Sequence, residues 1–345
     1  MQNPNILNIY FYDNIKNDLY NFESSSLRKN LKASLELNDY RYLTNAIDER
    51  IEAVCYINFN DVNKFNYFRG KDFKKITFAF YSEFEQDFKV LAFNKDKNKK
   101  YQIKESYLKN FSEYDLIFVP SEEAKTLLKE SKVESNIEVL LPPIKRTKFE
   151  LKDSELSKLI YIYFHIEENS KYVYTFLDSK DEQAAKRIIE LARIFSNIKF
   201  IVIIPDYHTK EAKAVSKYFK RCGQNLFVSS ILSEDIYDSL VYNASAFILL
   251  NSLYTASVEL LEAYTCGVPV LSLSSSAFKD ILIDKENSCV YNDFDAFING
   301  FNDFLAGKLP DLKDNQKTFM KTNDIKRIGK KFIDYYREYF GEWLC

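Results

Sequence analysis

Residues 260–273 read LLEAYTCGVPVLSL, and Gly267 within them is one of only seven glycines in the 345-residue chain. An apolar segment with helical spacing precedes this glycine, and Pro269, which cannot continue a helix, follows it. A glycine directly after a helix commonly adopts the left-handed backbone that other residues adopt only with strain. We therefore predict a helix over 258–264, capped by Gly267, and a buried strand over 268–273.

Short apolar runs alternate with amphipathic stretches along the rest of the chain. Strands are predicted at 6–12, 53–59, 76–81, 115–119, 137–141, 159–164, 200–204, 226–229 and 246–250. Helices are predicted at 27–43, 181–195, 210–220, 233–243 and 324–340, with a further helix that takes Ser121 as its N-cap. This alternation is typical of parallel sheets covered by helices, so the expected fold class is α/β.

A charged segment, KRTKFELKDSELSK at 145–158, separates two such runs of strands and helices. We interpret it as a linker between two Rossmann-like halves. Chain length favours the same count, since 345 residues exceed one average domain. In folds of this class, ligands bind in the cleft outside the carboxyl ends of the strands.

Composition excludes several classes of function. The formal net charge is -2, so no global field attracts nucleic acid, and no basic face accompanies a known nucleic-acid fold. The five cysteines are scattered without a CxxC pair, which favours a reduced cytosolic setting over metal or redox chemistry. We expect no signal peptide, and no apolar run reaches the roughly 18–20 residues of a membrane span. Nucleotide-hydrolysis, zinc-protease and serine-hydrolase motifs are absent from the sequence.

Capping explains Gly267, but it does not explain Glu262, a carboxylate near the start of a mostly apolar helix. A carboxylate at that place can hold a ribose diol through paired hydrogen bonds. In that case we expect it to face a cleft at the surface and to contribute little packing. The alternative is that Glu262 is a structural residue of the helix.

The segment SVELLEAYTCGVPVLSLSSSAFKDILIDKENSCVY, residues 257–291, resembles the nucleotide-sugar motif of retaining GT-B glycosyltransferases of the family-four type. The resemblance implies that Glu262 binds the donor's ribose. It also implies that residues 274–278, with Ser274, Ser275 and Ser276, bind the diphosphate through backbone N–H groups, as helix N-termini do.

Other segments carry the resemblance across most of the chain. SEYDLIFVPSEEAKTLL and RIIELARIFSNIKFIVIIP are similar to helix and strand pairs of the family's two domains. ESSSLRKNL, VCYINFND and FAFYSEFEQDF fall where glycolipid-forming members, the diglucosyl-diacylglycerol synthase type, carry their N-terminal motifs. The implied GT-B architecture has an N-terminal acceptor domain over 1–150, a C-terminal nucleotide-sugar domain over 151–325, and a final helix, 326–345, that crosses back.

The implied reaction moves a hexose from a UDP-linked nucleotide sugar, for example UDP-glucose, to a membrane glycolipid or cell-envelope glycan. No metal or cofactor is implied, and the expected location is cytoplasmic, at the inner face of the membrane. Glu83, Glu85 and Asp87 follow a predicted strand at its carboxyl end, where a carboxylate can orient the acceptor hydroxyl. A solvated loop is the alternative for these three residues.

Several positions depart from the family pattern. Tyr254 stands where a first donor-site Glu is usual, and Lys171 and His165 are the only candidate cations of the loop expected to bind the phosphates. The family's first glycine loop reads ESSSLRK here, so Ser24–Ser26 either bind a phosphate or cap the following helix. These departures leave an alternative open: a catalytically silent relative that acts as a binding or scaffold partner of another glycosyltransferase.

Residues 64–78, KFNYFRGKDFKKITF, mix cations with aromatic side chains. Such a mixture suits a peripheral membrane contact, with rings in the interface and cations toward the headgroups. The alternative is a surface helix and loop whose phenylalanines are buried.

Overall fold

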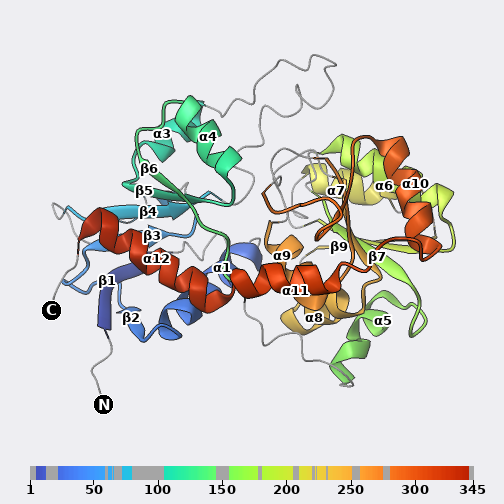
Figure 1. The fold of residues 1–345 in the computed structure, drawn as a ribbon, viewed down its shortest axis with the longest axis horizontal. Coiled ribbons are helices and arrows are strands. Elements are labelled where there is room, and N and C mark those ends of the chain that lie inside the picture. The colour runs from blue at the N-terminus through green and yellow to red at the C-terminus, as the bar shows by residue number, and fades with distance from the viewer. Residues whose placement is uncertain are drawn as a thin grey trace. The chain divides into compact units, whose positions relative to one another are not determined.

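A computed structural model shows how the chain folds (Figure 1). It describes residues 5–12, 22–58, 61–63, 65, 72–79, 105–144, 155–177, 181–204, 210–219, 222, 224–230, 232–250, 257–274 and 280–341. Contacts between Cα atoms divide the chain into two compact units. The first holds residues 1–145 and 322–345, and the second holds residues 146–321.

A six-stranded parallel sheet forms the centre of the first unit, with the strand order β2-β1-β3-β4-β5-β6. Its strands are β1 (Asn5–Tyr12), β2 (Tyr40–Leu43), β3 (Ala53–Tyr56), β4 (Lys74–Phe78), β5 (Leu116–Val119) and β6 (Asn136–Val139). Its described helices are α1 (Phe22–Glu36), α3 (Glu105–Phe111), α4 (Glu122–Glu130) and α12 (Ile325–Phe340).

The second unit contains another six-stranded parallel sheet, with the order β12-β11-β10-β7-β8-β9. Its strands are β7 (Tyr172–Phe176), β8 (Lys199–Ile203), β9 (Leu226–Ser229), β10 (Ala246–Leu249), β11 (Val270–Leu273) and β12 (Cys289–Tyr291). Its described helices are η5 (Glu155–Lys158), α5 (Leu159–Phe164), α6 (Glu182–Ile194), α7 (Lys210–Phe219), α8 (Glu234–Asn243), α9 (Ser257–Cys266), α10 (Phe294–Leu305) and α11 (Lys313–Thr322).

The two faces of the second sheet pack against different helices. Alternate residues of β7 point to opposite faces. Val173 therefore joins a core with α6, α7 and α10, whereas Tyr174 lies on the face of α8 and α9. The strand order reverses between β7 and β10, and the carboxyl ends of these two strands form the place where open α/β sheets usually bind ligands.

The predicted caps around Gly267 and Ser121 are confirmed. Gly267 ends α9 with φ +67°, its N–H donates to the Tyr264 carbonyl at 3.0 Å, and the Val268 N–H donates to the Ala263 carbonyl at 2.9 Å. This pair of bonds is the Schellman motif that glycine favours. The Ser121 hydroxyl accepts from the Ala124 N–H at 3.1 Å and so caps α4.

The predicted strand over 159–164 is wrong, because the structure has helix α5 there. Ile160, Tyr161 and Phe164 are buried, while Ile162 is 65% exposed. This spacing matches one face of a helix and not the alternation of a strand. The helix is anchored to α8 by a hydrogen bond of 3.0 Å from the Ile160 N–H to the Ser239 hydroxyl. It ends at His165, whose φ is +50°.

The predicted helix over 27–43 extends too far in the sequence. α1 ends at Glu36, Asp39 has a left-handed backbone with φ +63°, and Tyr40–Leu43 pair with β1 as the edge strand β2. Because α1 already begins at Phe22, Ser24–Ser26 lie inside it and do not precede it as a cap.

Helix α12, red in Figure 1, returns to the first unit and packs beside α1. Its apolar side, with Ile328, Phe332 and Ile333, joins the core of that unit. Gly329 permits the close approach, because a Cβ atom there would lie 2.4 Å from the Ser34 carbonyl oxygen. Among the described helices, none is both long enough and apolar enough to cross a lipid bilayer.

Candidate functional site

The carboxyl edge of the second sheet carries Ser274, the first residue of the predicted diphosphate loop. Ser274 follows β11 directly and is exposed, and its N–H donates to the Tyr291 carbonyl of β12 at 2.7 Å. This hydrogen bond continues the pairing of the two strands. Ser275 and Ser276, and likewise Tyr254, lie outside the described residues.

Contrary to the expectation from the sequence, Glu262 is buried, and only 2% of it is exposed. The Tyr237 hydroxyl of α8 donates a hydrogen bond to Oε2 of Glu262 on α9. Burial, followed by the charge of Glu262, raises the pKa of Tyr237 well above its ordinary value, so the phenol keeps the proton that it donates. The expectation of a surface-facing carboxylate with little packing is therefore corrected.

Other polar side chains are buried around the Tyr237–Glu262 hydrogen bond. Glu259 precedes Glu262 by three residues on α9, and only 1% of it is exposed. Burial raises the pKa of the Cys266 thiol well above its ordinary value, and the charges of Glu262 and Asp238 raise it further. Cys266 is therefore a protonated thiol, and the inner face of α9 is a buried acidic cluster against α8 and β7.

Lys171 and Ser274 lie at opposite ends of the parallel strands, Lys171 at the amino ends and Ser274 at the carboxyl ends. It directly precedes β7, and its carbonyl accepts from the Lys199 N–H at 3.4 Å at the start of β8. Five residues of strand span about 17 Å, and in a parallel sheet all amino ends lie on one edge. The structure therefore does not bring Lys171 together with Ser274. The phosphate-binding loop expected after a strand at 159–164 instead follows helix α5 and lies at the amino end of β7.

Sequence reasoning missed Arg187, which reaches the same carboxyl edge. Its Nη1 donates to the Leu250 carbonyl at 3.1 Å, directly after β10, and its guanidinium lies over the Phe294 ring at 5.9 Å. Burial lowers the pKa of this half-buried arginine, and the charge of Asp181 opposes that shift. The available signal was an arginine placed among the apolar positions 184, 185, 188 and 189 of a predicted helix.

In the first unit, aromatic side chains gather over β1 and β3. Phe65 is 5% exposed and contacts Tyr10, Tyr12 and Phe73, with ring centroids 5.4–5.7 Å apart. For Phe65, the structure thus agrees with the alternative of a buried phenylalanine within 64–78. The acceptor-side candidates Glu83, Glu85 and Asp87 lie outside the described residues.

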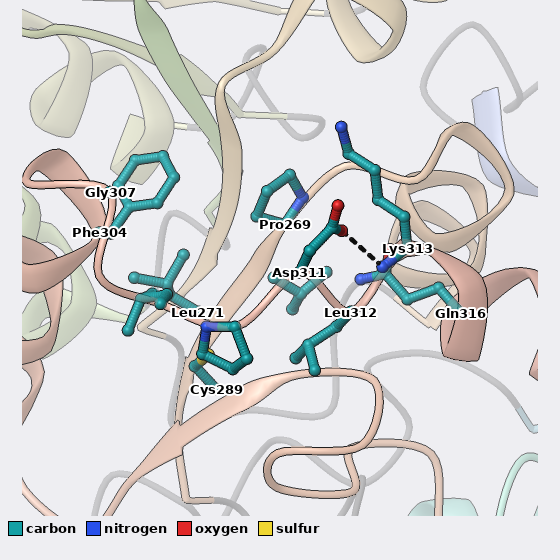
Figure 2. Close-up of a pocket in the computed structure, with 12 residues that line it drawn as sticks. Pro269, Leu271, Cys289, Phe304, Gly307, Asp311, Leu312, Lys313 and Gln316 are labelled. Atoms are coloured by element: carbon teal, nitrogen blue, oxygen red, sulfur yellow. Dashed lines mark hydrogen bonds between the residues drawn. The ribbon is translucent and has the colours of Figure 1, made fainter.

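A pocket of about 220 Å³ lies in the second unit (Figure 2). Pro269 and Cys289 line it at the amino ends of β11 and β12, together with the chain between α10 and α11. Asp311 belongs to its lining and accepts from the Lys313 N–H at 3.1 Å, the dashed line in Figure 2. Ser274 follows the other end of β11, so this pocket is separate from the predicted donor edge.

Solved structures share this architecture, although no family model and no curated protein sequence matches the chain. HepE from Anabaena, solved in complex with UDP and glucose, matches with a TM-score of 0.71 at 11% identity, over 95% of this chain and 99% of that chain. A glycosyltransferase from Rickettsia africae matches with a TM-score of 0.64 at 10% identity, over 99% of this chain and 100% of that chain.

Sucrose-phosphate synthase from Thermosynechococcus elongatus matches with a TM-score of 0.63 at 11% identity, over 84% of this chain and 74% of that chain. At these identities the likeness shows the fold alone. That fold is the expected GT-B class, with two Rossmann-like domains built on parallel sheets.

Proposed function

We propose that this chain is a glycosyltransferase that moves a hexose from a UDP-linked nucleotide sugar to a membrane glycolipid or cell-envelope glycan. The observation that carries the proposal is the match over 95% of the chain to HepE, whose structure holds UDP and glucose. The motif at 257–291 supports it, since it places a carboxylate, a glycine cap and a serine run in the order of a nucleotide-sugar site. Fold alone does not fix function, so the site residues must be tested directly.

In the proposed donor site, Glu262 binds the ribose, and Ser274, Ser275 and Ser276 bind the diphosphate, with Tyr254 on the sugar side. Tyr237 already donates to Oε2 of Glu262, so the ribose would share this carboxylate with Tyr237. The acceptor enters on the side of Glu83, Glu85 and Asp87 in the N-terminal domain, here taken as 1–150. Lys171 is left out of the proposed site because of its place at the amino edge of the sheet.

Transfer requires that the leaving diphosphate is stabilised as its charge grows, and that the acceptor hydroxyl is held beside the sugar. The Ser274 N–H already donates to the Tyr291 carbonyl, so the backbone N–H groups that would meet the first requirement are those after Ser274 in the predicted loop. Fixed dipoles need no reorganisation during the reaction. A carboxylate beside the acceptor suits the second requirement, because it can accept the hydroxyl proton. We place the reaction at the inner face of the membrane; within the candidate contact 64–78, Phe65 and residues 76–78 of the strand β4 are buried and take no part in it.

One observation favours a second candidate function, a silent relative that binds another glycosyltransferase. Glu262 is 2% exposed and already bonded to Tyr237, so the residue expected to bind ribose has a partner within the fold. In a silent relative, the role of Glu262 would be structural, as this bond is.

Calorimetric titration of UDP, GDP and UDP-glucose into the wild type and Glu262→Gln tests the proposal. Glutamine keeps an acceptor for Tyr237, so the fold is preserved while the ribose loses its carboxylate. We expect micromolar UDP binding by the wild type and a fall of about tenfold or more in the variant, as for hydrogen bonds to a charged group. Absence of nucleotide binding by the folded wild type would favour the silent relative.

A further inference from the structure

We propose that Arg187 is the cation that receives the donor's diphosphate at the carboxyl edge of the second sheet. This inference rests on the proposed function, and it concerns a residue outside the predicted site. Arg187 joins α6 to the end of β10, beside the reversal of strand order.

Arg187 connects the two sides of the switch point. Helix α6 follows β7, and its Arg187 reaches the Leu250 carbonyl at the end of β10, at 3.1 Å. β7 and β10 are the neighbouring strands between which the order reverses. Ligands of open α/β sheets bind outside the carboxyl ends at this place, so a guanidinium here lies where such a ligand arrives.

The predicted diphosphate loop begins at the end of the neighbouring strand, β11. β10 and β11 pair with Leu249 opposite Ser272. Leu250 therefore lies beside Leu273, which is the residue before Ser274. Adjacent strands lie about 4.8 Å apart. Phe294, over which the guanidinium lies, is the first residue of α10 after β12, at this same edge.

Arg187 has donors to spare for an anion. A guanidinium carries five N–H donors, and among the described residues the bond to Leu250 is the one recorded for it. The planar fork of arginine matches phosphate oxygens in pairs. Asp181 is near enough to act on its charge, but the Asp181 carboxylate also accepts from the Ala184 N–H at 3.0 Å as the cap of α6. The positive end of the α6 dipole adds to the attraction at this edge.

The structural alternative is that Arg187 only ties α6 to β10. Both readings predict some loss of stability on substitution, so stability does not separate them. The two roles are separated by the affinity for UDP relative to the affinity for uridine, which lacks the diphosphate.

The test is to measure the dissociation constants of UDP, by calorimetry, and of uridine, by ligand-observed NMR. The proteins are the wild type, Arg187→Met and Arg187→Lys, with Arg193→Met on the exposed side of the same helix as the control. We expect Arg187→Met to weaken UDP binding about 10- to 100-fold, the usual range for hydrogen bonds to charged groups, and to change uridine binding less than twofold. The UDP affinity of Arg187→Lys should lie between those of the wild type and Arg187→Met, because lysine keeps the charge but lacks the planar fork of donors.

Equal losses for UDP and uridine, or unchanged UDP affinity in a folded Arg187→Met protein, would overturn the inference and leave the proposed function standing. A wild type that binds neither UDP nor UDP-glucose would overturn the proposed function and this inference with it. Circular dichroism at the titration temperature verifies the fold of each variant. Arg187→Lys also provides the comparison if the methionine variant does not fold.

Discussion

Tyr237 donates its phenolic hydrogen to Oε2 of Glu262, and this bond joins α8 to α9 beneath the second sheet. The two residues are 25 positions apart in the sequence, and both are almost fully buried. The carboxylate that the motif assigns to a ligand is therefore also a structural partner. A substitution of Glu262 thus affects the fold as well as any nucleotide.

Glu262→Ala should lower the free energy of unfolding by about 2–4 kcal/mol, because it leaves a buried phenol without its acceptor and opens a cavity. Glu262→Gln should cost less than about 1 kcal/mol, since its amide oxygen still accepts from Tyr237. It also removes one carboxylate from a cluster that includes Glu259. Urea unfolding of both variants measures the difference. Equal losses in the two variants would show that the bond to Tyr237 contributes little.

Tyr237→Phe separates the structural role of Glu262 from the proposed ligand role. The variant removes the hydroxyl and leaves the carboxylate in place, so we expect a stability loss of about 1–3 kcal/mol from the lost hydrogen bond to a charged group. UDP affinity, measured by calorimetry, should fall less than in Glu262→Gln. An equal or larger fall would mean that nucleotide binding depends on the orientation that Tyr237 gives the carboxylate.

Gly267→Ala should destabilise the second unit by about 1–2 kcal/mol, because φ +67° is costly for a residue with a Cβ atom. That atom would also lie 3.3 Å from Cγ of Lys313. Gly307→Ala is the matched control, with φ +69° and open space around the new atom. Urea midpoints for the two variants compare backbone strain alone with strain plus contact. A larger loss for Gly307→Ala would contradict this account.

Gly329→Ala should cost about 1–3 kcal/mol by forcing α12 away from α1, because its Cβ atom would meet the Ser34 carbonyl oxygen at 2.4 Å. The loss belongs to the packing of two helices and not to backbone strain. Lys330→Ala, at the next and exposed position of α12, is the control and should change stability by less than about 0.5 kcal/mol. Thermal unfolding followed by circular dichroism compares them.

Glu138 links α12 to the first sheet and makes the stability of that unit depend on pH. Burial acts to raise its pKa, but hydrogen bonds from Lys125, at 2.7 Å, and from Tyr339 outweigh burial and hold the pKa below its ordinary 4.5. A depressed pKa contributes stability that is present above the ordinary value and is lost as pH falls through the folded value.

Glu138→Gln should therefore be less stable than the wild type at pH 7. The stability difference should narrow as pH falls below the ordinary pKa of 4.5 and the wild-type carboxylate takes up a proton. Urea unfolding of the two proteins at pH 3 and at pH 7 gives the stability difference at each pH. A gap that is the same at pH 3 and pH 7 would show that the charge of Glu138 does not stabilise the unit.

The predictions that hold are local in the chain. The cap at Gly267 depends on bonds within a few residues, and the cap at Ser121 likewise binds an N–H three residues ahead. The run at 159–164 was misassigned because six apolar and aromatic residues suit a buried strand and a short helix equally well. In the folded protein, the Ile160 N–H donates to the Ser239 hydroxyl of α8 and so ties the helix to that neighbour, which nothing within the run predicts.

By itself, the sequence determined the α/β class, the two parallel sheets and the position of the helix cap at Gly267. These follow from the spacing of apolar residues and from turn chemistry that acts over a few positions. Tertiary structure alone decided that Glu262 binds Tyr237, that Lys171 lies at the far edge of the sheet, and that Arg187 reaches Leu250, 63 residues away. Such pairings depend on the order of strands in the sheet, because that order sets which ends become neighbours.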